Sequence, residues 1–196
     1  MAQEKIKLSS PATKGAISIE ETLANRRSTR SFKDKALTLD QISQLLWAAQ
    51  GITEKNWGLR TAPSAGALYP LEIYALTKDG VYRYNPEGHS ITVLSKEDKR
   101  AALARAALGQ SFIASAPLDI VITAVYPRVT RKYGERGFRY VHIEVGHAAE
   151  NIHLQAVALG LGSVPIGAFN DGKVAEALTL PEEHEPCYII PVGYPK

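Results

Sequence analysis

Several residue types and sequence features are scarce in this chain of 196 residues, and each scarcity excludes a class of protein. Cysteine occurs once, at Cys187, which rules out a disulfide within the chain and any metal site built from cysteines. Because this thiol lies in an apolar run, residues 187–192, we expect it to be buried. No apolar run approaches the roughly 20 residues that span a bilayer, and residues 1–15 lack the apolar core of a signal peptide. We therefore expect no membrane partner and a cytoplasmic location.

The charged residues do not form the runs of like charge that are typical of nucleic-acid binding. The net charge is +3, and no run of five or more like charges occurs, so we expect no nucleic-acid partner. The apolar fraction of 45% and the charged fraction of 22% are ordinary for a globular protein. The length predicts a single domain, over residues 18–196, preceded by an extended arm over residues 1–17.

Three common catalytic motifs are also missing. The sequence has no Gly-x-Gly-x-x-Gly between a strand and a helix, no Walker loop and no Gly-x-Ser-x-Gly elbow. Chemistry that depends on nicotinamide alone, on ATP or on a serine nucleophile therefore lacks its usual anchor.

The most prominent feature present is a long apolar stretch from Tyr140 to Phe169. Its apolar residues recur at three- and four-residue steps, which predicts a helix of about five turns. They are Val141, Val145, Ala148, Ile152, Ala156 and Leu159. Further apolar or small residues lie off this face, so we expect the helix to be buried by the domain or by a partner subunit. Gly146, Ala148 and Ala149 would let another backbone come close, and Gly160 is placed to end the helix.

The same helix carries two Glu-x-x-His pairs, Glu144 with His147 and Glu150 with His153. Sites that hold two metal ions take such pairs from two different helices, with further glutamates from others. Because both pairs share one helix and no cysteine cluster accompanies them, we expect no metal site. We interpret these polar side chains as hydrogen-bonded within a crowded interface.

Signals for helices and strands alternate along the rest of the chain. Capping boxes begin at Ser18 and Thr38. Helices are expected at residues 18–25, 39–50, 95–108 and 171–178, and strands at residues 72–77, 81–84, 90–94, 118–126 and 187–192. Residues 53–70 and 127–139 are expected to be irregular connections, and a connection as long as the first is usually functional. Hairpin signals outnumber strand–helix–strand signals, which favours an α+β fold.

Three segments could bind a ligand. Residues 26–30, RRSTR, place three guanidinium groups and two hydroxyls in a donor cluster that suits bidentate contact with a phosphate. A solvated basic turn is an equally good interpretation of that segment taken alone. Residues 162–168, GSVPIGA, and residues 63–66, PSAG, contain glycines that let a backbone approach a flat ligand. Residues 162–168 taken alone would be interpreted as a core strand.

Together these segments resemble the FMN-dependent nitroreductase superfamily, and within it the SagB-type dehydrogenases, whose best-known members oxidise azolines to azoles. The resemblance covers about residues 18–195 and rests on four stretches in the right order and spacing. They are RRSTRSF, TAPSAGALYPLEIY, KYGERGFRYVHIEVGHAAENIHLQAVALGLGSVPIGAF and PVGYP. It implies a nitroreductase-like fold with a central, mostly antiparallel sheet flanked by helices, and a buried central helix at the interface of a homodimer.

The resemblance also implies which residues bind FMN. They are Arg26, Arg27, Ser28, Arg30, Pro63, Ser64, Ala65, Gly66, Pro165, Ile166, Gly167 and Ala168. The first three would hold the phosphate and the ribityl chain. Arg30 would lie at the pyrimidine edge of the flavin, where positive charge favours the anionic reduced state. Residues 63–66 would reach the flavin from the other subunit, and residues 165–168 would direct backbone N–H groups to its N5 and O4 atoms.

Two further expectations come from the resemblance. Lys132 and Tyr133 match the Lys-Tyr pair that azoline-oxidising members are thought to use as a base. Many nitroreductases also supply a Lys or Arg to the phosphate from beyond their last strand, whereas this sequence ends at Lys196. Either Lys196 or a residue such as Arg139 would then take that place, or the phosphate would be held less tightly.

The activity that the resemblance implies is transfer of hydride, through flavin N5, from a reductant such as NAD(P)H to a small organic acceptor such as a nitroaromatic compound or a quinone. Two alternatives stay open: a SagB-type dehydrogenase that oxidises a heterocycle or a peptide azoline, and a flavin-binding carrier without turnover. A purely structural dimer is the least specific alternative, and the arginine cluster argues against it.

Overall fold

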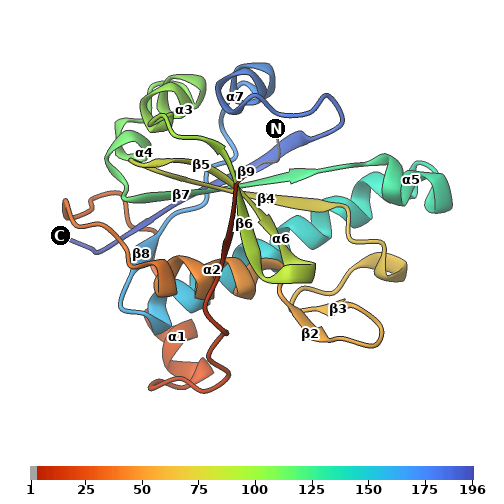
Figure 1. The fold of residues 1–196 in the computed structure, drawn as a ribbon, viewed down its shortest axis with the longest axis horizontal. Coiled ribbons are helices and arrows are strands. Elements are labelled where there is room, and N and C mark those ends of the chain that lie inside the picture. The colour runs from red at the N-terminus through yellow and green to blue at the C-terminus, as the bar shows by residue number, and fades with distance from the viewer. Residues whose placement is uncertain (1–3) are drawn as a thin grey trace.

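The computed structural model describes residues 4–196, which form one sheet with helices on both faces (Figure 1). The sheet has seven strands in the order β1-β6-β5-β4-β7-β9-β8, and every neighbouring pair is antiparallel. The strands are β1 (Lys5–Lys7), β4 (Leu71–Thr77), β5 (Gly80–Asn85), β6 (Ser90–Ser95), β7 (Leu118–Ala124), β8 (Gly162–Ser163) and β9 (Glu185–Gly193). A separate hairpin joins β2 (Ile52–Glu54) to β3 (Leu59–Arg60). The α+β architecture expected from the hairpin signals is confirmed.

Seven α-helices and two short 3-10 helices accompany the sheet in this part of the chain. They are α1 (Ile19–Asn25), α2 (Leu39–Gln50), α3 (Arg100–Ala106), α4 (Ser111–Ser115), α5 (Pro127–Tyr133), α6 (Arg136–Ala158), α7 (Asp171–Leu178), η1 (Ala65–Ala67) and η2 (Pro86–Gly88). Figure 1 shows α3, α4 and α7 on one side of the sheet and α1, α2 and α6 on the other. No helix within residues 4–196 is long and apolar enough to cross a membrane.

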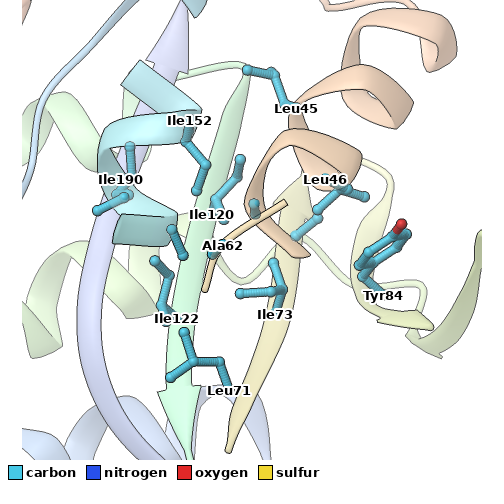
Figure 2. Close-up of a cluster of buried hydrophobic side chains, with 14 of the residues drawn as sticks. Leu45, Leu46, Ala62, Leu71, Ile73, Tyr84, Ile120, Ile122, Ile152 and Ile190 are labelled. Atoms are coloured by element: carbon cyan, nitrogen blue, oxygen red, sulfur yellow. The ribbon is translucent and has the colours of Figure 1, made fainter. Parts of the chain in front are cut away.

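Two hydrophobic cores follow from the alternation of side chains along the central strands. In β7, Ile120 and Ile122 pack toward α2 and α6, whereas Val121 packs toward α3 and α7. Figure 2 shows the first core, in which α2, α6 and strands β4, β7 and β9 meet. Its labelled members are Leu45, Leu46, Ala62, Leu71, Ile73, Tyr84, Ile120, Ile122, Ile152 and Ile190. Burial of these side chains fixes α6 against the sheet, and the candidate site is built at the two ends of α6.

The local signals for the first two helices are confirmed. Ser18 accepts a hydrogen bond from the backbone of Glu21, whose carboxylate accepts one from the backbone of Ser18. Thr38 and Gln41 make the same reciprocal pair at the start of α2. These pairs satisfy donors that a helix otherwise leaves free at its first turn, so both helices begin where the sequence predicts.

Helix α6 is buried along one face only. Val141, Ala148 and Ile152 are fully buried, but Ile143 on the other face is 49% exposed. Ala148 and Ala149, two of the small residues expected to let another backbone come close, pack inside this chain's own core. Gly146 is exposed and has nothing within 4 Å of the position that a side chain would occupy.

Three segments differ from the sequence-based expectation. Residues 127–139 contain α5 and the start of α6, because Pro127 suits the first turn of a helix and Gly134, with a φ of +55°, separates the two helices. The connection at residues 53–70 contains the β2–β3 hairpin and η1. The helix expected to begin at Ser95 begins at Arg100, because the Ser95 hydroxyl accepts from the Glu97 backbone inside a turn.

Smaller differences concern the remaining short elements. Within residues 112–116, expected as a short apolar turn, residues 112–115 belong to α4 and Ala116 follows its end. Part of the arm expected over residues 1–17 forms β1, which pairs with β6, while residues 1–3 lie outside the described residues. Cys187 is half-buried, with its sulfur 3.6 Å from the Tyr126 hydroxyl, and burial raises the pKa of its thiol.

Candidate functional site

The arginine segment, residues 26–30, lies directly beside β8. Ser28 forms a parallel bridge with Ser163, and the backbone N–H of Thr29 donates to the carbonyl oxygen of Ser163 over 3.0 Å. A side chain at Gly162 would place its Cβ atom 2.6 Å from the Thr29 hydroxyl oxygen, closer than such atoms can pack. Glycine at position 162 is therefore required for residues 26–30 to lie this close to β8. The fold thus joins the first predicted ligand segment to the start of the second.

The arginines of this segment differ in what they contact. The Arg27 guanidinium donates to the carbonyl oxygens of Ala24, at 3.0 Å, and Arg26, at 2.7 Å, and so closes the end of α1. The side chains of Arg26 and Arg30 make no hydrogen bond or ion pair to any residue of the described range 4–196. Within this segment, Arg26 and Arg30 are therefore the two guanidinium groups that can bind a ligand without breaking a contact.

Residues 165–168 continue from β8 along the end of β9. The N–H of Ile166 donates to Ile189 over 2.8 Å, and Pro165 has no N–H to offer. Gly167 and Ala168 are exposed, and within the described chain their N–H groups donate to no acceptor. Of the four residues expected to direct N–H groups at a flavin, two are therefore able to do so.

His153, which was expected to be hydrogen-bonded rather than to bind a metal, lies at this same junction. Its Nδ1 atom is 2.7 Å from the Ser163 hydroxyl, and its Nε2 atom is buried without a partner among the described residues. Burial, and then the positive charge of Arg26, lower the pKa of His153 to about 4. The imidazole is therefore neutral at pH 7. No group of three or more potential metal ligands occurs in residues 4–196.

The third ligand segment, residues 63–66, lies against Lys132 and Tyr133. Gly66 adopts a left-handed conformation with a φ of +64°, and a Cβ atom there would lie 2.7 Å from the Tyr133 hydroxyl and 3.0 Å from Lys132 Nζ. Tyr133 in turn packs edge-on against Tyr140, with ring centroids 5.1 Å apart. The segment and the Lys-Tyr pair, which the resemblance placed in separate roles, therefore form one group near the start of α6.

A buried carboxyl lies beneath this group. The Glu144 side chain is 2% exposed and accepts a hydrogen bond from Gln50 at 3.4 Å. Burial raises its pKa to about 7, and hydrogen bonds from Ser64 and Gln50 oppose the shift. Gln50 also accepts from Arg60 Nη1 at 3.0 Å, so an amide links a carboxyl to a guanidinium. No local pattern predicts this network, because its members come from four separate segments.

Within one chain the two groups lie far apart. Tyr140, beside the Lys-Tyr pair, and His153, beside β8, are both in α6. Their separation along the helix axis is about 20 Å at 1.5 Å per residue. One chain therefore does not bring residues 63–66 to the arginine segment.

The C-terminus lies with the arginine segment. The N–H of Lys196 donates to Ser31 over 3.2 Å, and Phe32 forms a bridge with Pro195. Arg139 is in the first turns of α6, at the opposite end of the helix. Of the two residues expected to substitute for a missing phosphate ligand, Lys196 is the one that this chain places near residues 26–30.

Comparison with known proteins decides the family. The family model described as "Nitroreductase family" matches residues 23–194. The chain belongs to the nitroreductase family. A Methanocaldococcus jannaschii protein assigned by name to the nitroreductases is 49% identical over 183 residues, which cover 90% of this chain and 91% of that protein. The resemblance drawn from the sequence motifs is confirmed at the level of the family.

Solved structures confirm the fold of this nitroreductase-family chain. A structure from Ralstonia eutropha, assigned in its description to the nitroreductases, superposes with a TM-score of 0.89 at 34% identity and covers 98% of this chain and 90% of that one. More distant relatives include the FMN reductase (NADPH) of Bacillus subtilis, 25% identical over 189 residues, and the microcin B17-processing protein McbC of Escherichia coli, 26% identical over 162 residues. The chain spans 65% of the first and 60% of the second.

Proposed function

We propose that this protein is an FMN-dependent oxidoreductase that passes a hydride from NAD(P)H to a small organic acceptor, such as a nitroaromatic compound or a quinone. Bound FMN would supply the redox chemistry, and the protein would supply position, charge and exclusion of competing reactions. Such a reductant fits the cytoplasmic location that we expected. The similarity to an FMN reductase supports the choice of cofactor.

The observation that carries this proposal is the contact between the arginine segment and β8. The Ser28–Ser163 bridge holds two guanidinium groups without protein partners beside the strand that leads into residues 165–168. A terminal phosphate suits a guanidinium fork. The edge of a flat ring with carbonyl and imine acceptors suits the two free N–H groups of Gly167 and Ala168. The residues present therefore fit FMN at both of its ends.

Each residue has a distinct task in this proposal. Arg26 and Ser28 would bind the phosphate and fix the cofactor in place. Arg30 would place positive charge near the pyrimidine edge of the flavin, where charge accumulates on reduction. Gly167 and Ala168 would orient the ring through their N–H groups. His153 stays neutral at pH 7, so it adds no further positive charge to the site.

The proposal requires a homodimer. Residues 63–66 and the Lys-Tyr pair lie at the far end of α6 from the arginine segment, so a second copy would have to supply them. Apolar side chains that such a copy could cover are exposed here: Ile19 and Leu23 of α1, at 55% and 56%, and Ile143 of α6. Obligate homodimers commonly bury 2,000 Å² or more in total.

A second candidate function is oxidation of a heterocycle or peptide azoline. The contact of Gly66 with Tyr133 and Lys132 supports it, because it places a phenol and an amine together beside the loop that would reach a flavin. The similarity to McbC supports the same candidate. In this reaction Lys132 or Tyr133 would accept the proton that leaves the ring as hydride departs.

An absorbance spectrum of the purified protein, followed by anaerobic addition of NADH or NADPH, tests the proposal. We expect the bands of oxidised flavin, bleaching by one of the two nucleotides, and recovery on addition of a quinone or a nitroaromatic compound. Chromatography of the released cofactor should identify FMN, since the chain lacks a fingerprint for a dinucleotide. Flavin bands that neither nucleotide bleaches would indicate the carrier or the azoline reaction. Failure to bind FMN at saturating concentration would overturn the proposal.

A further inference from the structure

A cavity lies away from the arginine segment and has no part in the proposed hydride transfer. It has a volume of about 840 Å³ and lies between residues 7–11, the end of α2, the β2–β3 hairpin and the turn after β5. This volume falls within the range of about 300–1,000 Å³ that is typical of small-molecule sites. Its position separates it from β8, but Ala67 and Tyr69 in its wall follow directly on the loop of residues 63–66.

The walls of this cavity are rich in aromatic rings. They include both tryptophans of the chain, Trp47 and Trp57, together with Tyr69 and Tyr84. The Trp57 side chain is 81% exposed, an unusual position for the largest apolar side chain. Trp47 and Tyr69 are half-buried and Tyr84 is 2% exposed, so Trp57 is the ring of this wall that is open to stack on a flat ligand.

The same cavity carries excess positive charge. Lys7, Lys55 and Arg60 line it, against a single carboxylate, Glu87. His89 also lines it, and burial lowers the pKa of that imidazole, so it adds no charge at pH 7. A negatively charged ligand would therefore be attracted to this hollow.

Arg60 is the cation that is fixed in place. Its guanidinium carbon lies 4.4 Å over the Tyr69 ring, and its Nη1 atom donates to Gln50. Its Nε atom is buried without a hydrogen-bond partner, and no carboxylate of residues 4–196 lies within ion-pair distance of it. Gln50 links it to the Glu144 carboxyl, and Glu144 and Glu72 act on its charge from beyond ion-pair distance. A partly buried, stacked guanidinium without an ion pair is costly unless an anion joins it.

We propose that this cavity binds a flat aromatic carboxylate, which would stack on the exposed Trp57 ring and place its carboxylate at Arg60. The planar guanidinium matches a carboxylate in shape and charge. The site stands apart from the arginine segment and does not require turnover of FMN.

Calorimetric titration of the protein as purified, with naphthalene-2-carboxylate and with naphthalene-2-carboxamide, tests this proposal. The two probes share a ring and differ in charge. We expect the carboxylate to bind at least about tenfold more tightly, as for a charge-assisted hydrogen bond. Arg60→Gln should abolish that preference, and Arg60→Lys should retain most of it. Trp57→Ala should weaken both probes. Arg105→Gln, on the exposed face of α3, is the matched control and should change neither.

Three results would overturn the proposal. Equal affinity for the two probes would remove the anion preference, and an unchanged preference in Arg60→Gln would remove Arg60 from the site. Absence of binding by both probes would show that the cavity does not take this class of ligand. A separate result bears on the flavin: loss of FMN in Arg60→Gln, with FMN retained in Arg26→Ala, would make this cavity the flavin site itself and would refute both assignments. Unfolding of Arg60→Gln would leave Arg60→Lys and Trp57→Ala to decide.

Discussion

The Nδ1 atom of His153 lies 2.7 Å from the hydroxyl of Ser163, and this pair ties the last turns of α6 to β8. Ser163 also pairs with Ser28, so the same residue connects α6 to the arginine segment. The order of contacts explains how a helix in the core positions residues 26–30: α6 fixes Ser163, and Ser163 fixes the backbone of Ser28 and Thr29. Stability and ligand binding should therefore be coupled at this junction.

The first prediction concerns protonation of His153. Its pKa is about 4 in the folded protein and about 6.5 when unfolded, so the unfolded state binds more protons between these values. Stability from this group is fully present above pH 6.5 and is lost as the pH falls toward 4, by about 3 kcal/mol in total. His153→Gln removes this titration. Urea unfolding from pH 4 to pH 7 should show a flatter acid limb in the variant than in the wild type, and parallel curves would contradict the prediction.

The second prediction concerns Glu144, for which the sign is opposite. Burial raises its pKa from 4.5 to about 7, so the folded state holds the proton that the unfolded state releases. Stability from this group is fully present below pH 4.5 and is lost as the pH rises to 7, again by about 3 kcal/mol. Glu144→Gln keeps the shape of the side chain and should make unfolding at pH 8 more costly than in the wild type. A variant that is less stable at pH 8 would show that the carboxylate has partners that favour its charge.

Structural features that depend only on neighbouring residues could be predicted from the sequence. The capping boxes at Ser18 and Thr38, and the tight turn between β4 and β5, each act within a few residues, and all three occur as expected. The segments at residues 26–30 and 162–168 could also be singled out, because glycine and arginine carry local information about backbone approach and phosphate binding. That these two segments touch each other is a property of the fold alone.

The features that could not be predicted from the sequence depend on burial by distant segments. Glu144 and His153 were interpreted as hydrogen-bonded residues of an interface, because nothing near them shows that Gln50 and Ser163 lie against them within the same chain. The polar segment 127–139 was expected to be irregular, since its helices have no continuous apolar face. Here α5 is held by packing of Val129 in the core and by the close approach of Gly137 to Thr130.

The third prediction concerns the phosphate. Arg26→Ala should weaken FMN binding by about ten- to a hundredfold, because a charge-assisted hydrogen bond contributes roughly 1.5–3 kcal/mol. Excess FMN should restore much of the activity. Arg27→Ala is the matched neighbour: its guanidinium closes the end of α1, so we expect a loss of stability with a smaller change in affinity. FMN dissociation constants measured by fluorescence quenching decide between them, and wild-type affinity in Arg26→Ala would remove that residue from the site.

The fourth prediction concerns the redox poise of the flavin. Arg30→Ala removes positive charge from where we place the pyrimidine edge, so the midpoint potential of bound flavin should fall. We expect a fall of about 20–30 mV, which corresponds to about 1 kcal/mol for two electrons. The effect should be no larger, because solvent screens the charge of an exposed arginine. Arg30→Lys should retain most of the wild-type potential. Spectroelectrochemical titration with the site saturated in FMN makes the measurement, and an unchanged potential in Arg30→Ala would refute the electrostatic role.

The last prediction tests whether one site is built from two chains. If Arg26 acts with residues 63–66 of a second copy, a subunit defective at Arg26 and a subunit defective at Gly66 can restore one intact site between them. Gly66→Val is a suitable defect, since the φ of +64° and the Tyr133 hydroxyl 2.7 Å from a Cβ position both oppose a side chain. Each variant alone should bind FMN poorly, whereas differently tagged subunits purified as a mixed dimer should bind about one FMN per two chains with nearly wild-type affinity. If the site lay within one chain, each subunit of the mixed dimer would keep its own defect, and no tight site would appear. A monomer at micromolar concentration by sedimentation equilibrium would contradict the shared site directly.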